Sequence, residues 1–406
     1  MTTNKHSNQK EPGALDGIKV IEHTTALAGP YCAQLLGDLG ADVIKIERPG
    51  QGDQARRWGP PFVGSESAYF LGTNRNKRGL TLDLSKAEGR DILHRLLPHT
   101  DVLVQNLPRE SSRRKLGLDE ATCRRINPGL IWTGISGFGK SGPYAERPGY
   151  DIIAQAMSGT MFITGEQEQE PIRFPTAIAD ITAGIYTAFA IVSALFARER
   201  TGKGQSIDTA LLDSQVTWLS YLASQHLATG EPVQKLGNAH PSIVPYQPFP
   251  AADGWVIVAV GSERLWQRLV EVMESPKLAD DPRFTTNPDR IAHRHELVLL
   301  LTERFRQQTS EHWLQKLTAA GIPAGPIHTP AQSLTDEHLL SRGMVVELEH
   351  PVLGAIRSLG NPMKLSGTPV NYRLPPPLLG EHTVEILNEL GYGQDAIQHF
   401  QNEGVV

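Results

Sequence analysis

Short runs of β-branched and apolar residues alternate with helical patterns through the first half of this chain. This alternation restricts the possible folds more than any other feature. The helical patterns cover residues 31–39 and 86–97, and Gly40 and Pro49-Gly50 supply stop and turn signals. Alternating strands and helices are typical of a parallel sheet with helices on both faces. The sequence therefore predicts a doubly wound, Rossmann-like α/β domain with strands at residues 18–22, 42–47, 81–84, 101–105, 130–135 and 205–209.

The second half of the chain has a different composition. Prolines become frequent after Gly230, and a strand pattern at residues 255–260 precedes amphipathic helix patterns at residues 263–273, 292–307 and 310–320. We predict a smaller α+β domain, with its linkers, at residues 226–330. Residues 1–225 then form the large domain, completed by residues 331–406, which include a helix pattern near residues 381–390.

Composition and charge argue against several classes of protein. Apolar and charged fractions of 39% and 20% are those of a soluble globular chain. A net charge of −5 gives no general affinity for nucleic acid or an anionic membrane, so we expect neither as a partner. Cys32 and Cys123 form neither a disulfide framework nor a metal site, which favours a cytoplasmic location. Residues 1–12 lack the apolar core of a signal peptide.

A single charged residue, Asp180, lies between Arg173 and Arg198, at the start of an apolar helix pattern. The apolar stretch at residues 181–197 is short for a bilayer span and favours a buried helix. Asp180 has two possible roles. It could cap the helix by accepting a hydrogen bond from a free backbone N–H, or it could be a carboxylate kept dry to act as a nucleophile.

Two nucleotide-binding motifs overlap after the strand at residues 130–135. Residues 137–142 match G-x-G-x-x-G, and residues 134–141 match the P-loop pattern. Both mechanisms need a helix directly after the glycines. Pro143 and Pro148-Gly149 argue against a helix before about Tyr150, so we interpret both matches as coincidental. His240 has no second ligand at a metal spacing, and we expect no metal site.

Several segments together resemble the class III CoA-transferase family, which includes formyl-CoA and carnitine-CoA transferases. The match runs through nearly the whole chain in the family's order. It covers residues 15–20, 27–30, 39–50, 52–53, 74–78, 135–139, 147–151, 155–156 and 201–205. The resemblance implies CoA transfer from an acyl-CoA donor to a carboxylic acid, and a homodimer of interlocked, ring-like chains. It implies CoA thioesters as substrates, with no permanently bound cofactor.

The resemblance also implies roles for individual residues. Asp180 stands at the position of the family's catalytic carboxylate, and we expect it to be ionised at pH 7 and to form an aspartyl-CoA thioester through mixed anhydrides. Asp151 either supports the site's hydrogen bonds or merely begins a helix. Oxyanion donors are expected from the loop of Gly137 and Gly139 or near His240.

The family's CoA contacts fall on one set of positions in this sequence. Lys77 and Arg78 have surface solvation as an alternative, and either Arg114 or Lys115 takes the family's phosphate-binding position. The chain departs from the family pattern at Leu107 and in the segment that follows it. The candidate CoA-binding residues are Leu27, Ala28, Arg48, Lys77, Arg78, Asn106, Arg114 and Lys115.

Two departures bear on the reaction. The family's α-methylacyl-CoA racemases have a histidine where this chain has Tyr150, whose pKa near 10 suits proton abstraction poorly. A transferase is therefore favoured over a racemase. Residues 238–246 replace the glycine run of formyl-CoA transferases and resemble the branch that uses succinyl-CoA and short dicarboxylic acids. A non-catalytic protein that binds CoA or a nucleotide is the alternative from another class.

Overall fold

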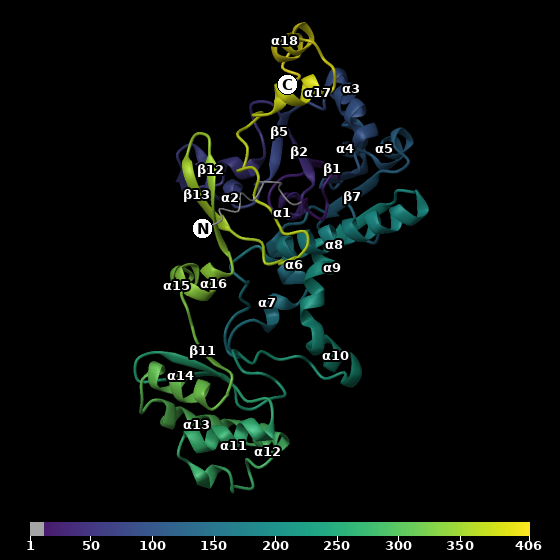
Figure 1. Cartoon of the computed structure of the whole chain (residues 1–406). Coiled ribbons are helices and arrows are strands. Elements are labelled where there is room, and N and C mark those ends of the chain that lie inside the picture. Colours follow the sequence, from purple (N-terminus) through teal and green to yellow (C-terminus); the bar gives the residue numbers. More distant parts are fainter. Residues whose placement is uncertain (1–11) are drawn as a thin grey trace, which may run out of the picture. The chain divides into compact units, whose positions relative to one another are not determined.

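A computed structural model describes residues 12–406, which divide into two compact units (Figure 1). The first unit comprises residues 12–161, Arg173–Ser220 and His338–Val406. The second comprises Phe162–Ile172 and Tyr221–Glu337. A short segment of the first half, residues 162–172, thus belongs to the second unit, an assignment that no local pattern in the sequence indicates.

The first unit is built on a six-stranded parallel sheet with the strand order β5-β2-β1-β6-β7-β8. The prediction of an α/β fold with a parallel central sheet is confirmed. One predicted strand, at residues 81–84, lies too late in the chain, because β5 begins at Lys77, a basic residue that is fully buried. The strands are β1 (Lys19–His23), β2 (Asp42–Glu47), β5 (Lys77–Thr81), β6 (Val102–Gln105), β7 (Ile131–Ser136) and β8 (Ser206–Ala210).

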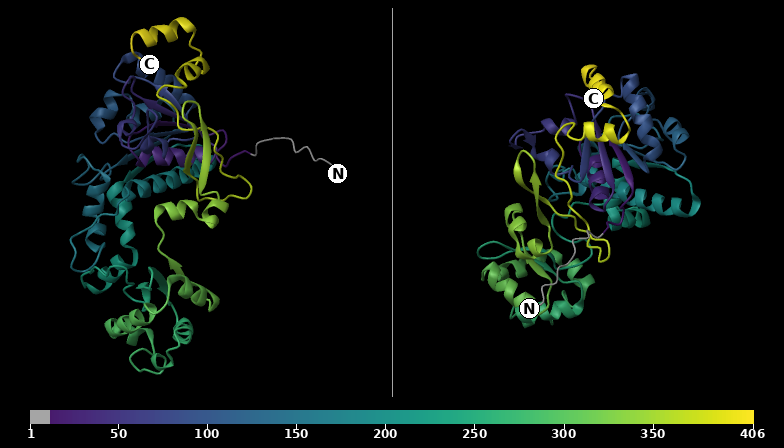
Figure 2. Two further views of the ribbon diagram at one scale, coloured as in Figure 1. Left: turned by 90° about the vertical axis from the view of Figure 1, so that its left-hand side faces the viewer. Right: turned by 45° about the horizontal axis from the view of Figure 1, so that its top comes forward.

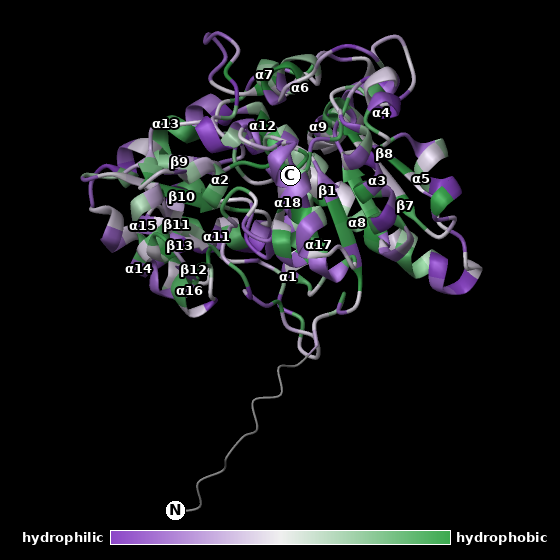
Figure 3. Ribbon diagram, turned by 90° about the horizontal axis from the view of Figure 1, so that it is seen from above, coloured by the Kyte–Doolittle hydropathy of each residue, from purple (hydrophilic) through white to green (hydrophobic). Residues whose placement is uncertain are grey.

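Helices cover both faces of this sheet because successive side chains of a strand point to opposite faces. Val20 packs in the core on one face, and its neighbour Ile21 packs in the core on the other. Figure 3 colours helix α8 largely as hydrophobic. The first core lies under α1 (Ala28–Asp38) and α8 (Ile178–Thr201), and the second under α3 (Ala87–Leu96), α5 (Glu120–Ile126), α17 (Thr383–Glu389) and α18 (Gln394–Asn402).

Helix α8 packs closely on α1 because Gly184 has no side chain. A Cβ at Gly184 would lie 2.8 Å from the carbonyl oxygen of Ala28, which is closer than Cβ atoms approach backbone. Within residues 12–406, α8 is long and apolar enough to cross a membrane by length and composition alone, a test that core helices of soluble proteins also pass. One face of α8, including Ala183 and Ile191, is buried in the core of the first unit.

The remaining elements of the first unit are short. They are η1 (Gln54–Arg57), β3 (Phe62–Val63), β4 (Glu66–Ser67), α2 (Ala68–Leu71), η2 (Leu97–His99), α4 (Glu110–Lys115), α6 (Asp151–Met157), α9 (Leu211–Val216), η3 (Thr217–Leu219), α16 (Glu337–Ser341), β12 (Val345–His350) and β13 (Gly354–Leu359); Thr160–Ile163 forms α7 at the boundary.

A buried carboxylate, Asp38, attaches the C-terminal segment, residues 338–406, to the rest of the first unit. Its oxygens accept two hydrogen bonds from the Arg75 guanidinium and others from the amides of Asn76 and Asn361. Arg75 also donates to the carbonyl oxygen of Leu359. In both views of Figure 2 the C-terminal helices, in yellow, lie beside the blue α3 segment, where they share its core.

The second unit has a three-stranded antiparallel sheet, β11-β10-β9, packed against helices around its own core. The predicted strand at residues 255–260 and the three predicted helices lie within about two residues of the observed ones. The elements are α10 (Ser220–Thr229), β9 (Tyr246–Pro250), β10 (Trp255–Ala259), α11 (Glu263–Val272), η4 (Pro276–Leu278), α12 (Asn287–Ala292), α13 (Arg294–Phe305), α14 (Ser310–Ala319), β11 (Ala324–Pro326) and α15 (Pro330–Thr335).

The Asp38 contacts predict a large stability effect. Asp38→Ala leaves the buried Arg75 guanidinium without its carboxylate, so we expect the free energy of unfolding to fall by about 3–5 kcal/mol. Asp42→Ala is the matched control, because Arg78 keeps Glu385 and Glu389 as partners, and its effect should be below about 1 kcal/mol. Urea unfolding measures both; equal losses in the two variants would contradict the role assigned to Asp38.

Candidate active site

Two cavities meet where the strand order of the sheet reverses, between β1 and β6. Ligands of doubly wound folds bind at such a point, outside the carboxyl ends of the strands. Thr25 follows β1 and Asn106 follows β6. The side-chain amide of Asn106 accepts a hydrogen bond from the N–H of Thr25 and donates one to its carbonyl oxygen. Thr25 lines both cavities. We call the one of about 490 Å³ the Asp180 cavity and the one of about 500 Å³ the Arg48 cavity.

Asp180 lies in the first turn of α8 but does not cap the helix. The N-cap residue is Ala177, which makes no side-chain cap hydrogen bond. The N–H of Ala179 is instead satisfied by a carboxylate from another element, Asp151 Oδ1, at 2.8 Å. Since Asp151 takes over the capping role, the carboxylate of Asp180 is left to face the cavity that it lines.

The surroundings of Asp180 oppose its ionisation. Burial, and then the nearby negative charge of Asp151, raise the pKa of Asp180 to about 7, against a hydrogen bond from the backbone of Ala28 that lowers it. The expectation that Asp180 is fully ionised at pH 7 is therefore wrong. At neutral pH the side chain is divided between its protonated and ionised forms.

Asp151 both begins a helix and organises the site. It is the first residue of α6, and its second oxygen accepts a hydrogen bond of 2.7 Å from the Gln155 amide. Gln155 in turn accepts from the N–H of Phe174 and donates to the carbonyl oxygens of Phe174 and Thr176. The segment that leads into α8 is thus fixed on α6 through one buried amide.

The other walls of the Asp180 cavity come from separate parts of the first unit. Tyr150 lines it and is 61% exposed. Trp58 and Tyr69 line it as an edge-to-face pair whose ring centroids are 4.9 Å apart. Burial and the charge of Asp180 raise the pKa of Tyr69 to about 12, so its hydroxyl stays protonated. Sequence reasoning missed Trp58 and Tyr69, because the segment after β2 carries no periodic pattern that marks it.

The glycine motif after β7 serves packing at this cavity. A Cβ at Gly137 would lie 2.6 Å from the Cα of Gly149, so the two backbone segments touch. Gly137 lines the Asp180 cavity, whereas Gly139, at φ +84°, does not. The next helix, α6, begins only at Asp151. The interpretation of the nucleotide motifs as coincidental agrees with this geometry.

The Arg48 cavity lies at the carboxyl end of β2 and is lined by Arg48, Lys115 and the neutral His23, whose pKa burial lowers to about 4. Lys45 bridges the buried carboxylates of Glu22 and Asp53 at 2.9 and 3.1 Å, and Asp53 also lines this cavity. This buried ion network holds the turn after β1, because Lys45 donates to the carbonyl oxygen of Thr24 and Asp53 accepts from the N–H of Ala26.

Four predicted CoA contacts lie outside both cavities. Lys77 is fully buried, and its ammonium group contacts Glu22, Asn74 and two backbone carbonyls, so it cannot reach a ligand. The Arg114 side chain is 73% exposed and pairs with Glu110. Leu27 is buried before α1, although Ala28 lines the Asp180 cavity.

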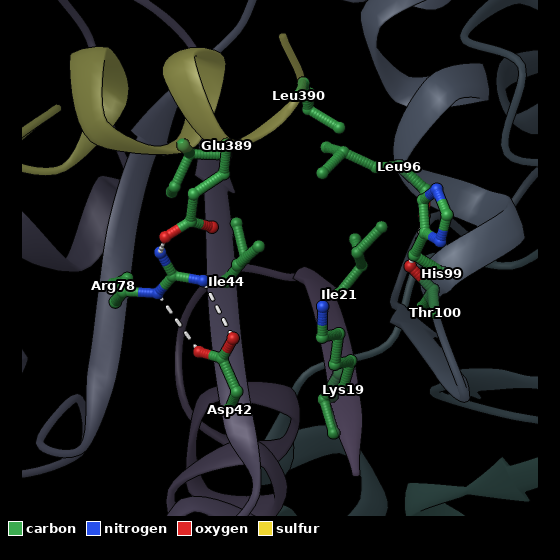
Figure 4. Close-up of a pocket in the computed structure, with 12 residues that line it drawn as sticks. Lys19, Ile21, Asp42, Ile44, Arg78, Leu96, His99, Thr100, Glu389 and Leu390 are labelled. Atoms are coloured by element: carbon green, nitrogen blue, oxygen red, sulfur yellow. Dashed lines mark hydrogen bonds and ion pairs between the residues drawn. The ribbon is translucent and has the colours of Figure 1, made fainter. Parts of the chain in front are cut away.

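Arg78 lies at the opposite edge of the sheet, in a pocket near the starts of β1 and β2 (Figure 4). There it pairs with Asp42, Glu385 and Glu389. Lys77 and Arg78 thus line neither the Asp180 cavity nor the Arg48 cavity, and in this structure the basic sequence tag makes internal ion pairs. His240 belongs to the second unit, where its ring stacks on Tyr221.

The predicted residues that do line the cavities are Ala28, Asn106, Gly137, Tyr150, Asp151 and Asp180 in one and Arg48 and Lys115 in the other. Among residues 12–406 no group of three or more histidine, cysteine or acidic side chains could hold a metal ion. The site is thus a partly buried carboxylate in the first turn of a helix. Thr25 also lines a second cavity, where Arg48 and Lys115 occur together with Glu47, Asp53 and Asp83.

A family model described as CoA-transferase family III matches residues 15–383, and the chain belongs to that family. The resemblance noted in the sequence is confirmed, and the chain is a class III CoA-transferase.

Named relatives match over almost the full length. The chain is 40% identical to a Homo sapiens succinyl-CoA:glutarate CoA-transferase, over 97% of this chain and 90% of that protein. It is 42% identical to a succinate–glutarate CoA-transferase of Agrobacterium fabrum, over 94% of this chain and 96% of that protein. The crystal structure of a CAIB/BAIF family protein from Brucella suis superposes with a TM-score of 0.83 at 42% identity, covering 94% of this chain and all of that one.

The raised pKa of Asp180 predicts a pH-dependent stability. Because the folded state holds this proton more tightly than the unfolded chain does, stability falls as the pH rises from about 4 to about 7. Asp180→Asn removes this titration. We expect the variant to match the wild type near pH 4 and to exceed it by about 2 kcal/mol at pH 8, after discounting for partial exposure. Urea unfolding at several pH values measures the difference; a gap independent of pH would contradict the assignment.

Proposed function

We propose that this chain moves CoA from succinyl-CoA to a short dicarboxylic acid through a thioester between Asp180 and CoA. The observation that carries the proposal is a carboxylate that lines a cavity, is partly buried, and does not cap its helix because Asp151 does so. The relatives add the substrate class, since two of them are named for succinyl-CoA or succinate together with glutarate.

The proposed reaction begins with attack on the donor. An oxygen of the ionised Asp180 bonds to the thioester carbon, the carbon–sulfur bond breaks, and CoA leaves as its thiolate. The thiolate then attacks the side-chain carbonyl carbon of Asp180 and displaces the donor acid as a carboxylate. The acceptor carboxylate repeats both steps in reverse and restores Asp180. No proton is gained or lost overall, and no thioester energy is lost to water.

The protein groups around Asp180 suit these steps. The backbone hydrogen bond at Ala28 and the N-terminus of α8 favour negative charge on the carboxylate, whereas burial keeps it poorly solvated and hence reactive. Backbone N–H groups at Gly137 are the proposed oxyanion donors, because Gly137 lines the cavity. The CoA thioester is a substrate, and no permanently bound cofactor is needed.

CoA would lie across both cavities. We place its pantetheine arm beside Asn106 and Thr25, where the cavities meet, and its nucleotide phosphates at Arg48 and Lys115. Within residues 12–406 neither basic side chain makes a hydrogen bond or a salt bridge, although Arg48 lies near enough to Asp83 to lower the pKa of that carboxyl. Paired basic groups of this kind suit phosphate recognition.

We also propose a homodimer, interlocked as the family resemblance implies. The face of α8 opposite the core carries Ile185, Phe189 and Phe196, and Phe189 is 71% exposed. Large exposed apolar faces mark association surfaces. A cytoplasmic location stays a prediction.

The nucleophile is tested by trapping. After incubation with succinyl-CoA, hydroxylamine should convert Asp180 to a hydroxamate that peptide mass spectrometry locates. Asp180→Ala should lose CoA exchange by at least about 10⁴-fold, because no other group completes the covalent path. Its affinity for CoA by calorimetry should change less than about threefold. A hydroxamate on another residue, or residual exchange above that level, would reject Asp180 as the nucleophile.

The CoA site is tested separately. Arg48→Met should raise the KM for the acyl-CoA donor about tenfold and leave the KM of the acceptor acid nearly unchanged, because a phosphate contact is lost. Arg114→Met is the matched control, since Arg114 is exposed and paired with Glu110. Initial-rate kinetics at two salt concentrations measure both. A larger effect in the control would place the phosphates elsewhere.

A further inference from the structure

We infer that Arg173 selects dicarboxylic acids by binding the carboxylate that does not react. The inference rests on the proposed function, because it assumes that acyl groups are held against Asp180. It identifies a specificity-determining residue in the Asp180 cavity, which both Arg173 and Asp180 line.

The charges of the cavity make a cation necessary for a dianionic acid. Arg173 is the one basic residue among those that line the Asp180 cavity, and the two acidic ones are Asp151 and Asp180. Both oxygens of Asp151 are committed, to the N–H of Ala179 and to the Gln155 amide. An incoming second carboxylate would meet only like charge in this cavity without Arg173.

The guanidinium of Arg173 is free for this task. It takes part in none of the hydrogen bonds or ion pairs identified among residues 12–406, and the residue is exposed. Two other arginines of the same unit each donate two hydrogen bonds to one carboxylate: Arg56 to Glu47 and Arg75 to Asp38. An arginine that lines a cavity and whose guanidinium N–H groups have no protein partner can make the same two-point contact with a substrate carboxylate.

The backbone holds Arg173 in a fixed frame with the reacting group. Its neighbour Phe174 donates its N–H to the Gln155 amide oxygen at 2.8 Å, and the Gln155 nitrogen donates to Asp151. Asp151 in turn receives the N–H of Ala179, next to Asp180. The hydrogen bonds therefore run without a break from the residue after Arg173 to the residue before Asp180. Such preorganisation lets a binding contact discriminate between acids.

Donor and acceptor should use Arg173 in the same way. In the proposed reaction each acyl group passes through a mixed anhydride with the single carboxylate of Asp180, so both acids occupy one position in turn. The second carboxylate of succinyl-CoA and that of the acceptor acid would thus meet the same guanidinium. Selectivity should appear in both halves of the exchange.

The test compares acids that differ in one end group. Glutarate is paired with pentanoate as acceptor, and succinyl-CoA with butyryl-CoA as donor, since each pair exchanges a carboxylate for a methyl group. In Arg173→Met we expect kcat/KM to fall about 100-fold for glutarate and for succinyl-CoA, mainly through KM, and to change less than about threefold for pentanoate and butyryl-CoA. Arg173→Lys should keep part of the preference for the dicarboxylic substrates, because lysine keeps the positive charge but lacks the planar guanidinium that makes a two-point contact.

Arg125→Met is the matched control, because Arg125 is exposed on α5 and lines neither cavity. It should leave both preference ratios unchanged. Equal losses on both members of a pair, or an unchanged ratio in Arg173→Met, would overturn the inference. Hydroxylamine trapping of wild-type Asp180 in the same preparations reports on the proposed function alone. Trapping with an unchanged ratio rejects only the role of Arg173, whereas failure to trap rejects the covalent path itself.

Discussion

The hydrogen bond from the N–H of Ala179 to the carboxylate of Asp151 is the contact on which the site depends. Asp151 belongs to another helix, α6, and accepts a hydrogen bond from a free N–H at the start of α8. The acidic residue of α8 itself, Asp180, therefore does not cap the helix. The carboxylate of Asp151 also holds Gln155, which fixes the segment leading into the helix. Its charge also helps to keep the pKa of Asp180 near neutrality, after the larger effect of burial. One carboxylate thus positions another and adds to the effect of burial on its pKa.

Buried ion networks hold the frame around this contact. Glu22 is a clear case, because burial opposes its ionisation and yet the charges of Lys45 and Lys77 lower its pKa to about 2. Paired in this way, buried charges are tolerated and fix the geometry of the turns that carry them. The buried ion pair of Asp38 and Arg75 likewise fixes the position of the C-terminal segment. These networks explain why the conspicuous basic tag at residues 74–78 meets carboxylates and carbonyls instead of a ligand.

Local patterns predicted the sheet and the longer helices, because a period of two or of 3.6 residues is visible in a long element, whereas short helices such as α4 and α6 carry too few residues to show one. Five of six strands were placed closely. The sixth, β5, was predicted too late in the chain, because a lysine that begins a buried strand looks like a surface residue. Asp180 could be singled out, since an isolated charge in an apolar helix is rare. The raised pKa of Asp180 could not be predicted, because it depends on burial in the folded chain and on the charge of Asp151, which belongs to another helix. Trp58 and Tyr69 reach the cavity only through tertiary packing, for which the sequence has no period.

The central claim, a covalent bond between Asp180 and CoA, is tested most directly by crystallography of the enzyme soaked with succinyl-CoA. The account predicts continuous electron density from the side-chain carbon of Asp180 to the sulfur of CoA, with the arm passing Asn106 and the phosphates near Arg48. Intact succinyl-CoA beside an unmodified Asp180, or CoA bound away from both cavities, would contradict it.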